Sequence, residues 1–142
     1  FFGAVFSRLG TPMLLTEFLL SWDISVTWVL LIIMALIFLL GWPLEWVPIV
    51  LIIVPILIPV LIKLDVNLVW FGILVAVNLQ TAWLSPPVAL SAYFLKGVVP
   101  EWDLKDIYLG MMQFMVIQVI GLVLIFVFPQ IALWLPTLIY GE

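Results

Sequence analysis

Long uncharged runs, separated by a few charged residues, dominate the pattern of hydrophobic and polar positions along this chain. Residues 24 to 44 carry no charge, and the run from Ile24 to Leu40 is apolar around its whole helical circumference. A helix needs about 20 mostly apolar residues to cross the hydrocarbon core of a bilayer. With Trp42 at the end of the run, where an interfacial aromatic residue belongs, the pattern predicts a transmembrane helix over residues 24–42.

Prolines interrupt the next uncharged run. Pro55 and Pro59 each remove a backbone donor and crowd the preceding turn of a helix. Residues 43–62 are therefore predicted to form either a proline-broken helix or a hairpin that enters and leaves the membrane by the same face. The pattern alone leaves both forms open.

A third uncharged run contains a double proline, Pro86 and Pro87. The residue before a proline is disfavoured in the helical region, so a helix has to stop near Ser85. We expect residues 68–95 to form a discontinuous helix that is broken at 84–87.

The rest of the chain adds one further span and two weaker segments. Residues 106–128 are long and apolar enough to cross, with Asp103 as the expected N-cap. Residues 129–142 suit an interfacial tail, and residues 1–22 suit a tilted or interfacial helical segment. The predicted fold class is an all-α integral membrane protein with about four to five membrane segments, in which residues 23–142 form one helical bundle.

Composition narrows the function. Of the 142 residues, 68% are hydrophobic and 8% are charged, against about 25% charged in an ordinary soluble domain. The absence of His and Cys excludes the usual metal sites and nucleophile–base pairs, so neither an enzyme nor a cofactor beyond a possible Na⁺ is expected. A formal charge of -4 offers no surface for nucleic acid. The chain opens without Met, which we interpret as part of a longer product.

The predicted break carries the main candidate chemistry. Asn78, Thr81 and Ser85 are spaced so that one helical stripe presents three oxygens, whereas Gln80 points elsewhere. Unwound carbonyls and half-helix ends in the middle of a bilayer favour Na⁺ and anions, as in secondary transporters. The competing interpretation is that these side chains only bind a neighbouring helix, which is the role we expect for Gln113 and Gln118.

The region from Val69 to Leu95 resembles the signature of a known family: the large (DctM-like) permease subunit of tripartite ATP-independent periplasmic (TRAP) transporters, and within it the mannitol and chloroaromatic branch. The resemblance extends over nearly the whole chain. The matching residues are Phe71, Gly72, Asn78, Leu79, Gln80, Thr81, Pro86, Pro87, Lys96, Gly97 and Val98, with Gly41, Glu45, Pro55 and Pro59 upstream and Asp106, Ile107, Tyr108, Gly110, Pro129, Trp134, Leu135 and Pro136 downstream.

This resemblance implies a multi-pass protein of the bacterial inner membrane that couples Na⁺ entry to uptake of an organic acid. It implies two partners, a small TRAP membrane subunit and a periplasmic substrate-binding protein. The chain would correspond to the C-terminal portion and second inverted repeat, with Pro48 to Pro59 in its hairpin and Asn78 to Pro87 in its broken helix. Asn78, Thr81 and Ser85 are then the candidate Na⁺ or substrate contacts.

Two positions depart from the family pattern. Ser85 stands where Thr is usual and keeps the hydroxyl, and Ala89 stands where Gly is usual. A lone repeat has no opposite half to complete a midplane site. The alternative function is therefore a non-transporting structural subunit that packs against other transmembrane subunits and lipid, for example in a respiratory or photosynthetic complex.

Overall fold

The computed structural model describes residue 5 and residues 8–21, 24–85 and 89–141, and within these ranges it contains helices and no strand. The all-α prediction is confirmed for this part of the chain. In chain order the helical elements are α2 (Thr11–Leu20), α3 (Val26–Gly41), α4 (Trp46–Pro48), the π-helical segment η1 (Ile49–Ile53), α5 (Val54–Lys63), α6 (Leu68–Leu84), α7 (Leu90–Val98), α8 (Leu104–Val127) and α9 (Gln130–Tyr140).

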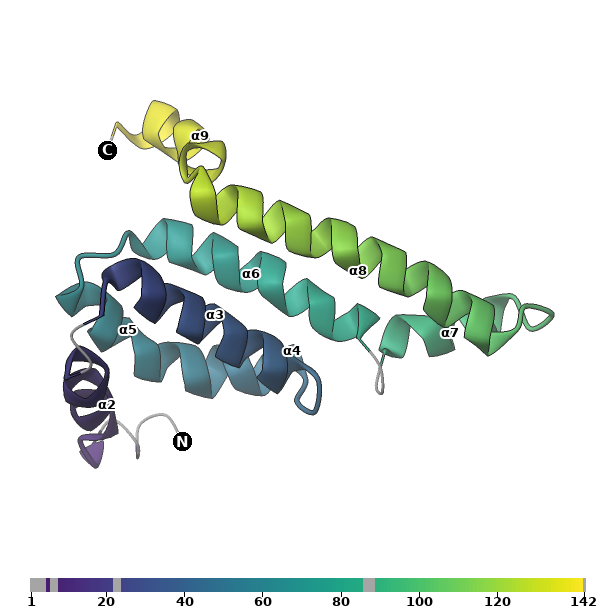
Figure 1. The fold of residues 1–142 in the computed structure, drawn as a ribbon, viewed down its shortest axis with the longest axis horizontal. Coiled ribbons are helices and arrows are strands. Elements are labelled where there is room, and N and C mark those ends of the chain that lie inside the picture. Colours follow the sequence, from purple (N-terminus) through teal and green to yellow (C-terminus); the bar gives the residue numbers. More distant parts are fainter. Residues whose placement is uncertain (1–4, 6–7, 22–23, 86–88, 142) are drawn as a thin grey trace.

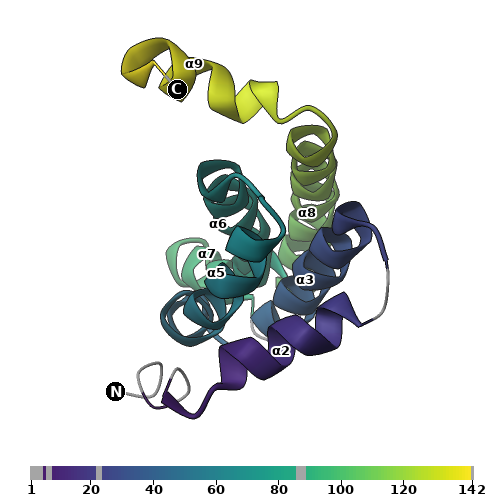
Figure 2. The ribbon, with the colours of Figure 1, turned by 90° about the vertical axis from the view of Figure 1, so that its left-hand side faces the viewer.

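The helices form an elongated bundle whose long members lie roughly side by side (Figure 1). α3 and α6 run in one direction, and α5 and α8 run in the other. α8 packs along α6 and continues along α7, so it bridges both pieces of the discontinuous helix. α2 crosses the end of the bundle against α5, as Figure 2 shows.

The segment from Trp46 to Lys63 is one continuous apolar helix of 18 residues, made of α4, η1 and α5. The hairpin form considered for residues 43–62 is not observed. Pro55 stands in the first turn of α5 and Pro59 lies inside it. Pro55 has no N–H to offer the carbonyl four residues earlier, and the helix takes up this defect as the π-helical turns of η1 rather than as a chain reversal.

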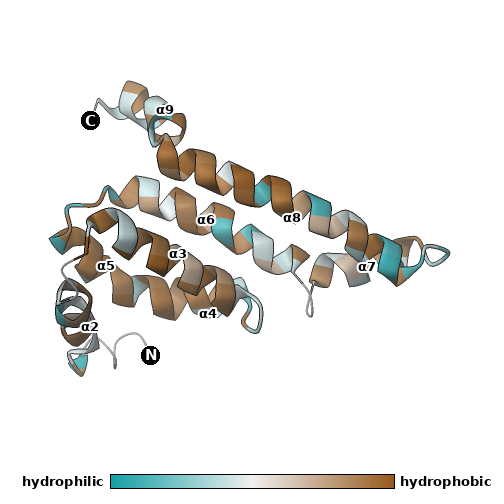
Figure 3. Ribbon diagram, viewed as in Figure 1, coloured by the Kyte–Doolittle hydropathy of each residue, from teal (hydrophilic) through white to brown (hydrophobic). Residues whose placement is uncertain are grey.

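Within the described residues, two helices are long and apolar enough to cross a membrane: Trp46–Lys63 and Leu104–Val127. α8 begins as expected, because Asp103 Oδ1 accepts a hydrogen bond of 2.9 Å from the Lys105 N–H at its N-terminus. α3 lies within the predicted span over residues 24–42, but its 16 residues extend only about 24 Å. Figure 3 shows that apolar residues cover these helices, whereas hydrophilic ones gather mainly in the loops.

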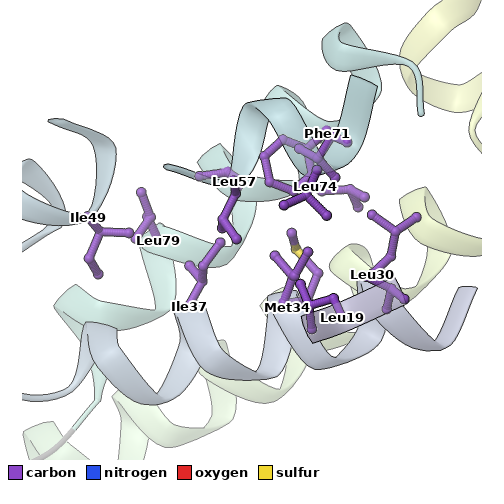
Figure 4. Close-up of a cluster of buried hydrophobic side chains, with 14 residues drawn as sticks. Leu19, Leu30, Met34, Ile37, Ile49, Leu57, Phe71, Leu74 and Leu79 are labelled. Carbon is purple, nitrogen blue, oxygen red and sulfur yellow. The ribbon is translucent and has the colours of Figure 1, made fainter. Parts of the chain in front are cut away.

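The core lies between α3, α5 and α6, with contributions from α2 and η1 (Figure 4). Ile37, Leu61 and Leu74 are fully buried there. The outer faces are also apolar, and α8 exposes large side chains such as Phe114 and Ile117. A bundle that is apolar outside as well as inside is adapted to lipid rather than to water.

Candidate functional site

The three predicted site residues lie together on one buried stripe of α6. Asn78 and Thr81 are each 1% exposed and Ser85 is fully buried. Gln80, one position from Thr81, is exposed on another face, as the helical spacing predicted. Burying three polar side chains in so apolar a bundle is costly unless each has a partner.

Within the described residues, the side-chain amide of Asn78 has a hydrogen-bond partner for its nitrogen and none for its oxygen. Its Nδ2 donates to the carbonyl oxygen of Met34 in α3 over 2.8 Å. Its Oδ1 is buried, and no donor reaches it from the described residues. An unsatisfied buried acceptor costs roughly 1–3 kcal/mol, so Asn78 keeps a free oxygen inside the bundle at the expense of stability.

The two hydroxyls bond back to the backbone of their own helix. Thr81 Oγ1 donates to the carbonyl oxygen of Asn78 over 2.6 Å, and Ser85 Oγ donates to that of Thr81, also over 2.6 Å. Ser85 Oγ also lies 3.3 Å from Met115 Sδ of α8. Because a hydroxyl donates one proton and keeps two lone pairs, both oxygens can still accept from a ligand or coordinate a cation.

The stripe lies against the middle of its neighbouring helices. Met34 is close to the midpoint of α3, and Met115 is close to the midpoint of α8. α6 ends at Leu84 and α7 begins at Leu90, so the helical path is interrupted beside Ser85. Pro86 and Pro87, the predicted cause of this interruption, lie outside the described residues.

Ala89 marks the start of α7 with an unusual backbone. Its φ of 28° and ψ of 59° lie in the left-handed half of conformational space, and its side chain is fully buried. A side chain with a Cβ is strained there, whereas glycine is not. The departure from Gly noted in the sequence therefore falls on a position where the backbone favours Gly.

Replacing Ala89 by glycine is expected to stabilise the protein by about 1 kcal/mol, because it removes the strain of the left-handed conformation. Thermal unfolding in detergent should show a higher midpoint for Ala89→Gly. The matched control is Ala92→Gly inside α7, which should lower the midpoint because glycine is a poor helix former. Equal destabilisation by both changes would contradict the strained backbone at Ala89.

The two glutamines of α8, Gln118 and Gln113, differ in their hydrogen bonding. Gln118 Nε2 donates to the side-chain oxygen of Gln80 and, over 3.3 Å, to the carbonyl oxygen of Val77, which confirms a structural hydrogen bond between α8 and α6. Gln113 is exposed on α8 and has no hydrogen bond within the described residues, so the expected structural bond is not observed for it.

A pocket of about 470 Å³ opens between α4, η1 and α6. It is lined by Trp46, Val50, Ala76, Leu79, Gln80 and Trp83. The sequence pattern predicted an interfacial position for Trp42 and did not predict that Trp46 or Trp83 lines a pocket. The spacing of Ala76, Gln80 and Trp83 on one helical face was the signal that could have placed Trp83 beside a pocket.

The donor set of the stripe consists of neutral oxygens. The described residues hold no group of three or more His, Cys, Asp or Glu side chains placed to bind a metal. Transition metals prefer imidazole and thiolate ligands, and Ca²⁺ prefers carboxylates. The amide and hydroxyl oxygens of the stripe are neutral, hard ligands of the kind that alkali and alkaline-earth cations accept.

Comparison with known proteins gives one family. The family described as "Tripartite ATP-independent periplasmic transporter, DctM component" matches residues 1–131. The chain is 31% identical over 142 residues to the sialic acid TRAP transporter large permease protein SiaM of Vibrio cholerae, with 99% of this chain and 33% of the relative covered. It is 30% identical over 138 residues to the C4-dicarboxylate TRAP transporter large permease protein DctM of Rhodobacter capsulatus, with 97% and 31% covered.

A third relative is the sialic acid TRAP transporter permease protein SiaT of Haemophilus influenzae, 28% identical over 139 residues, with 98% of this chain and 22% of the relative covered. The chain thus spans between 22% and 33% of the length of these three relatives. No solved structure matches the chain.

Proposed function

Since this chain belongs to the family of the DctM component, the large permease of TRAP transporters, we propose that it works within a secondary transporter that couples Na⁺ entry to the uptake of an organic acid. Family membership implies a membrane location. We further propose that this membrane is the bacterial inner membrane, that the chain supplies the C-terminal repeat, and that a small membrane subunit and a periplasmic binding protein act with it. Its assignment to the mannitol and chloroaromatic branch remains part of this proposal.

One observation carries the Na⁺ proposal: the buried Oδ1 of Asn78 has no donor within the described residues, although it lies against the middle of α3. Folded proteins rarely leave a buried acceptor without a protein, water or ion partner. A cation needs oxygen lone pairs and no protons, which is what Oδ1 offers. Thr81 Oγ1 and Ser85 Oγ add two more oxygens on the same stripe of α6.

Each residue has a distinct role in this proposal. Asn78 provides a carbonyl-type ligand held in orientation by its Nδ2 bond to α3. The Thr81 hydroxyl donates its proton to the backbone carbonyl oxygen of Asn78, so that the lone pairs of Oγ1 remain for the ion. Ser85, at the end of α6, joins the stripe to the helix break, where carbonyls without helical partners can complete the coordination shell.

The proposed substrate class rests on the helix ends and on the relatives. α7 starts beside the break, and no side chain of the described residues caps its N-terminus. Such a half-helix N-terminus carries partial positive charge and favours an anionic group. The relatives above are named for sialic acid and C4-dicarboxylates, which are both carboxylic acids. All three are named permeases, so the structural-subunit alternative gains no support.

The decisive experiment is uptake of labelled succinate and labelled sialic acid into proteoliposomes that hold the protein with its native partners. We expect uptake of an organic acid that depends on an inward Na⁺ gradient. Thr81→Ala should raise the Na⁺ concentration for half-maximal uptake about fivefold, as expected from loss of an interaction of about 1 kcal/mol. The matched control is Thr137→Ala on the exposed face of α9, which should behave like the wild type.

Uptake that is indifferent to Na⁺ would overturn the coupling proposal. If uptake depends on Na⁺ but Thr81→Ala and Thr137→Ala give the same Na⁺ response, coupling would stand and Thr81 would be removed from the ion site.

A further inference from the structure

A second pocket lies at the opposite end of α6 from the helix break. Its volume is about 470 Å³, and it forms where α3 and α6 begin and where α5 and α8 end. The lining residues are Val26, Thr27, Leu30, Leu64, Asp65, Val66, Asn67, Trp70, Phe126 and Val127. This pocket shares no lining residue with the candidate ion site, and the inference drawn from it is independent of Na⁺ coupling.

Three polar groups line this otherwise apolar pocket. The side chains of Asp65, Thr27 and Asn67 are all exposed at the mouth of the pocket. The carboxylate of Asp65 and the hydroxyl of Thr27 have no hydrogen bond or ion pair with any described residue. Asn67 Oδ1 accepts from the Trp70 N–H over 3.0 Å as the N-cap of α6, which leaves its Nδ2 to donate elsewhere. The pocket thus offers an anionic acceptor, a neutral hydroxyl and an amide donor.

The apolar wall is fixed in place by contacts between α6 and α8. Trp70 Nε1 donates to the carbonyl oxygen of Ile125 over 2.9 Å, which orients the indole ring. The ring of Phe126 lies beside it, tilted by 44°, with 5.6 Å between the centroids. Leu30 and Val66 complete the wall. A rigid aromatic and aliphatic wall suits a hydrocarbon chain and also a cation placed over the indole face.

The helix ends divide the pocket into regions of opposite polarity. α5 and α8 present their C-termini, which carry partial negative charge, and Asp65 between α5 and α6 adds a full one. Lys63, in the last turn of α5, carries a positive charge but does not line the pocket. α3 presents its N-terminus beside Thr27, and Asn67 supplies its donor at the start of α6. A cation and an anion a few bonds apart would therefore each find a complementary region.

The ends of α5 and α8 also indicate the depth of this pocket in a membrane. α5 forms the last part of one described segment that is long enough to span, and α8 is the other such segment. A segment that spans a membrane ends at the level of the lipid headgroups. We propose that the pocket binds a zwitterionic membrane lipid with a primary ammonium group, phosphatidylethanolamine. The ammonium donates to Asp65 and Thr27, the phosphate accepts from Asn67, and the acyl chain lies against Trp70 and Phe126. A choline headgroup has no N–H and cannot make the first two bonds.

The test is native mass spectrometry of the intact, delipidated protein in detergent, titrated separately with dioleoyl phosphatidylethanolamine, phosphatidylcholine and phosphatidylglycerol. Wild-type protein should bind the ethanolamine lipid at least tenfold more tightly than the other two, and Asp65→Asn should lose about tenfold of that affinity, as expected for a hydrogen bond to a charged group. Asn tolerates the left-handed backbone of Asp65, whose φ is 55°. The matched control, Glu45→Gln at the other end of the bundle, should bind like the wild type.

A second variant, Thr27→Val, keeps the test informative if Asp65→Asn is poorly folded, and it should weaken binding of the ethanolamine lipid alone. Equal binding of the three lipids by the wild type, or equal lipid affinity in Asp65→Asn and Glu45→Gln, would overturn the proposal. Displacement of the lipid by an equimolar amount of soluble glycerophosphoethanolamine would also overturn it, because a membrane lipid owes much of its affinity to the acyl chain.

Discussion

An Asn78→Leu variant is expected to lose Na⁺-dependent uptake while remaining about as stable as the wild type. Leucine has the same branching as asparagine, with bulkier methyl groups, and offers no oxygen to a cation. Interactions of a charged group with a polar partner contribute about 1.5–3 kcal/mol, so the half-saturating Na⁺ concentration should rise roughly ten- to hundredfold. The measurement is initial uptake rate against external Na⁺ in proteoliposomes.

The stability half of this prediction follows from the unsatisfied acceptor. Leucine removes the buried Oδ1, whose desolvation costs about 1–3 kcal/mol, and also removes the Nδ2 bond to Met34, which contributes about 1 kcal/mol. The carbonyl of Met34 keeps its place in the helical ladder of α3. A methyl group needs more room than the Nδ2 that lies 2.8 Å from the Met34 carbonyl oxygen, and this overpacking offsets the gain by about 1–3 kcal/mol. The unfolding midpoint in detergent should therefore stay nearly level.

Gln118→Leu is the matched control, because it makes the same amide-to-leucine change at a residue whose amide is bonded. It removes the bonds to Gln80 and Val77, so it should lower stability by about 1 kcal/mol and leave the Na⁺ response unchanged. If Asn78→Leu behaves like Gln118→Leu in both assays, the unsatisfied oxygen of Asn78 has no role in ion binding.

The largest effect on stability is expected for Leu74→Ala. Leu74 is 0% exposed in the core between α3 and α6 (Figure 4). In water, such a change costs about 2–5 kcal/mol, which combines the transfer of the lost carbons with the cavity left behind. In lipid the transfer contribution is small, because acyl chains are as apolar as leucine. The cavity contribution remains, so we expect a loss of about 2 kcal/mol.

Leu109→Ala on α8 is the control for this prediction, since Leu109 is 57% exposed and its removal opens no cavity. Unfolding in detergent titrated with sodium dodecyl sulfate would compare the two variants. A similar loss of stability in both would mean that solvation, rather than packing around Leu74, determines the stability of the bundle.

The polar stripe of α6 shows what the sequence pattern could and could not predict. Helical spacing was sufficient to put Asn78, Thr81 and Ser85 on one stripe and Gln80 on another face. Spacing could not indicate that Asn78 Nδ2 would find a carbonyl in α3 while Oδ1 would find no donor, because that partner lies 44 residues away in the sequence.

The prolines of α5 also show that a local sequence signal can be compatible with more than one backbone structure. Pro55 and Pro59 were compatible with a hairpin or a broken helix, because a missing donor does not determine how the backbone compensates. The packing of α5 against α2 and of η1 against α3 accompanies a continuous helix with π-helical turns. Where local strain has two solutions of similar cost, the neighbouring helices select one of them.

By itself, the sequence determined that the described chain is helical, which uncharged runs form its main helices, and where the helix near Ser85 has to stop. These features follow from local rules, because in an apolar environment each backbone group needs a partner within its own helix and proline removes one. Only the tertiary structure decided which side of each helix is buried, that Oδ1 of Asn78 has no donor among the described residues, and that four helix ends border an open pocket lined by Asp65. The reason is that these features depend on contacts between distant segments, such as the bond from Trp70 to Ile125 across 55 residues, which no local pattern contains.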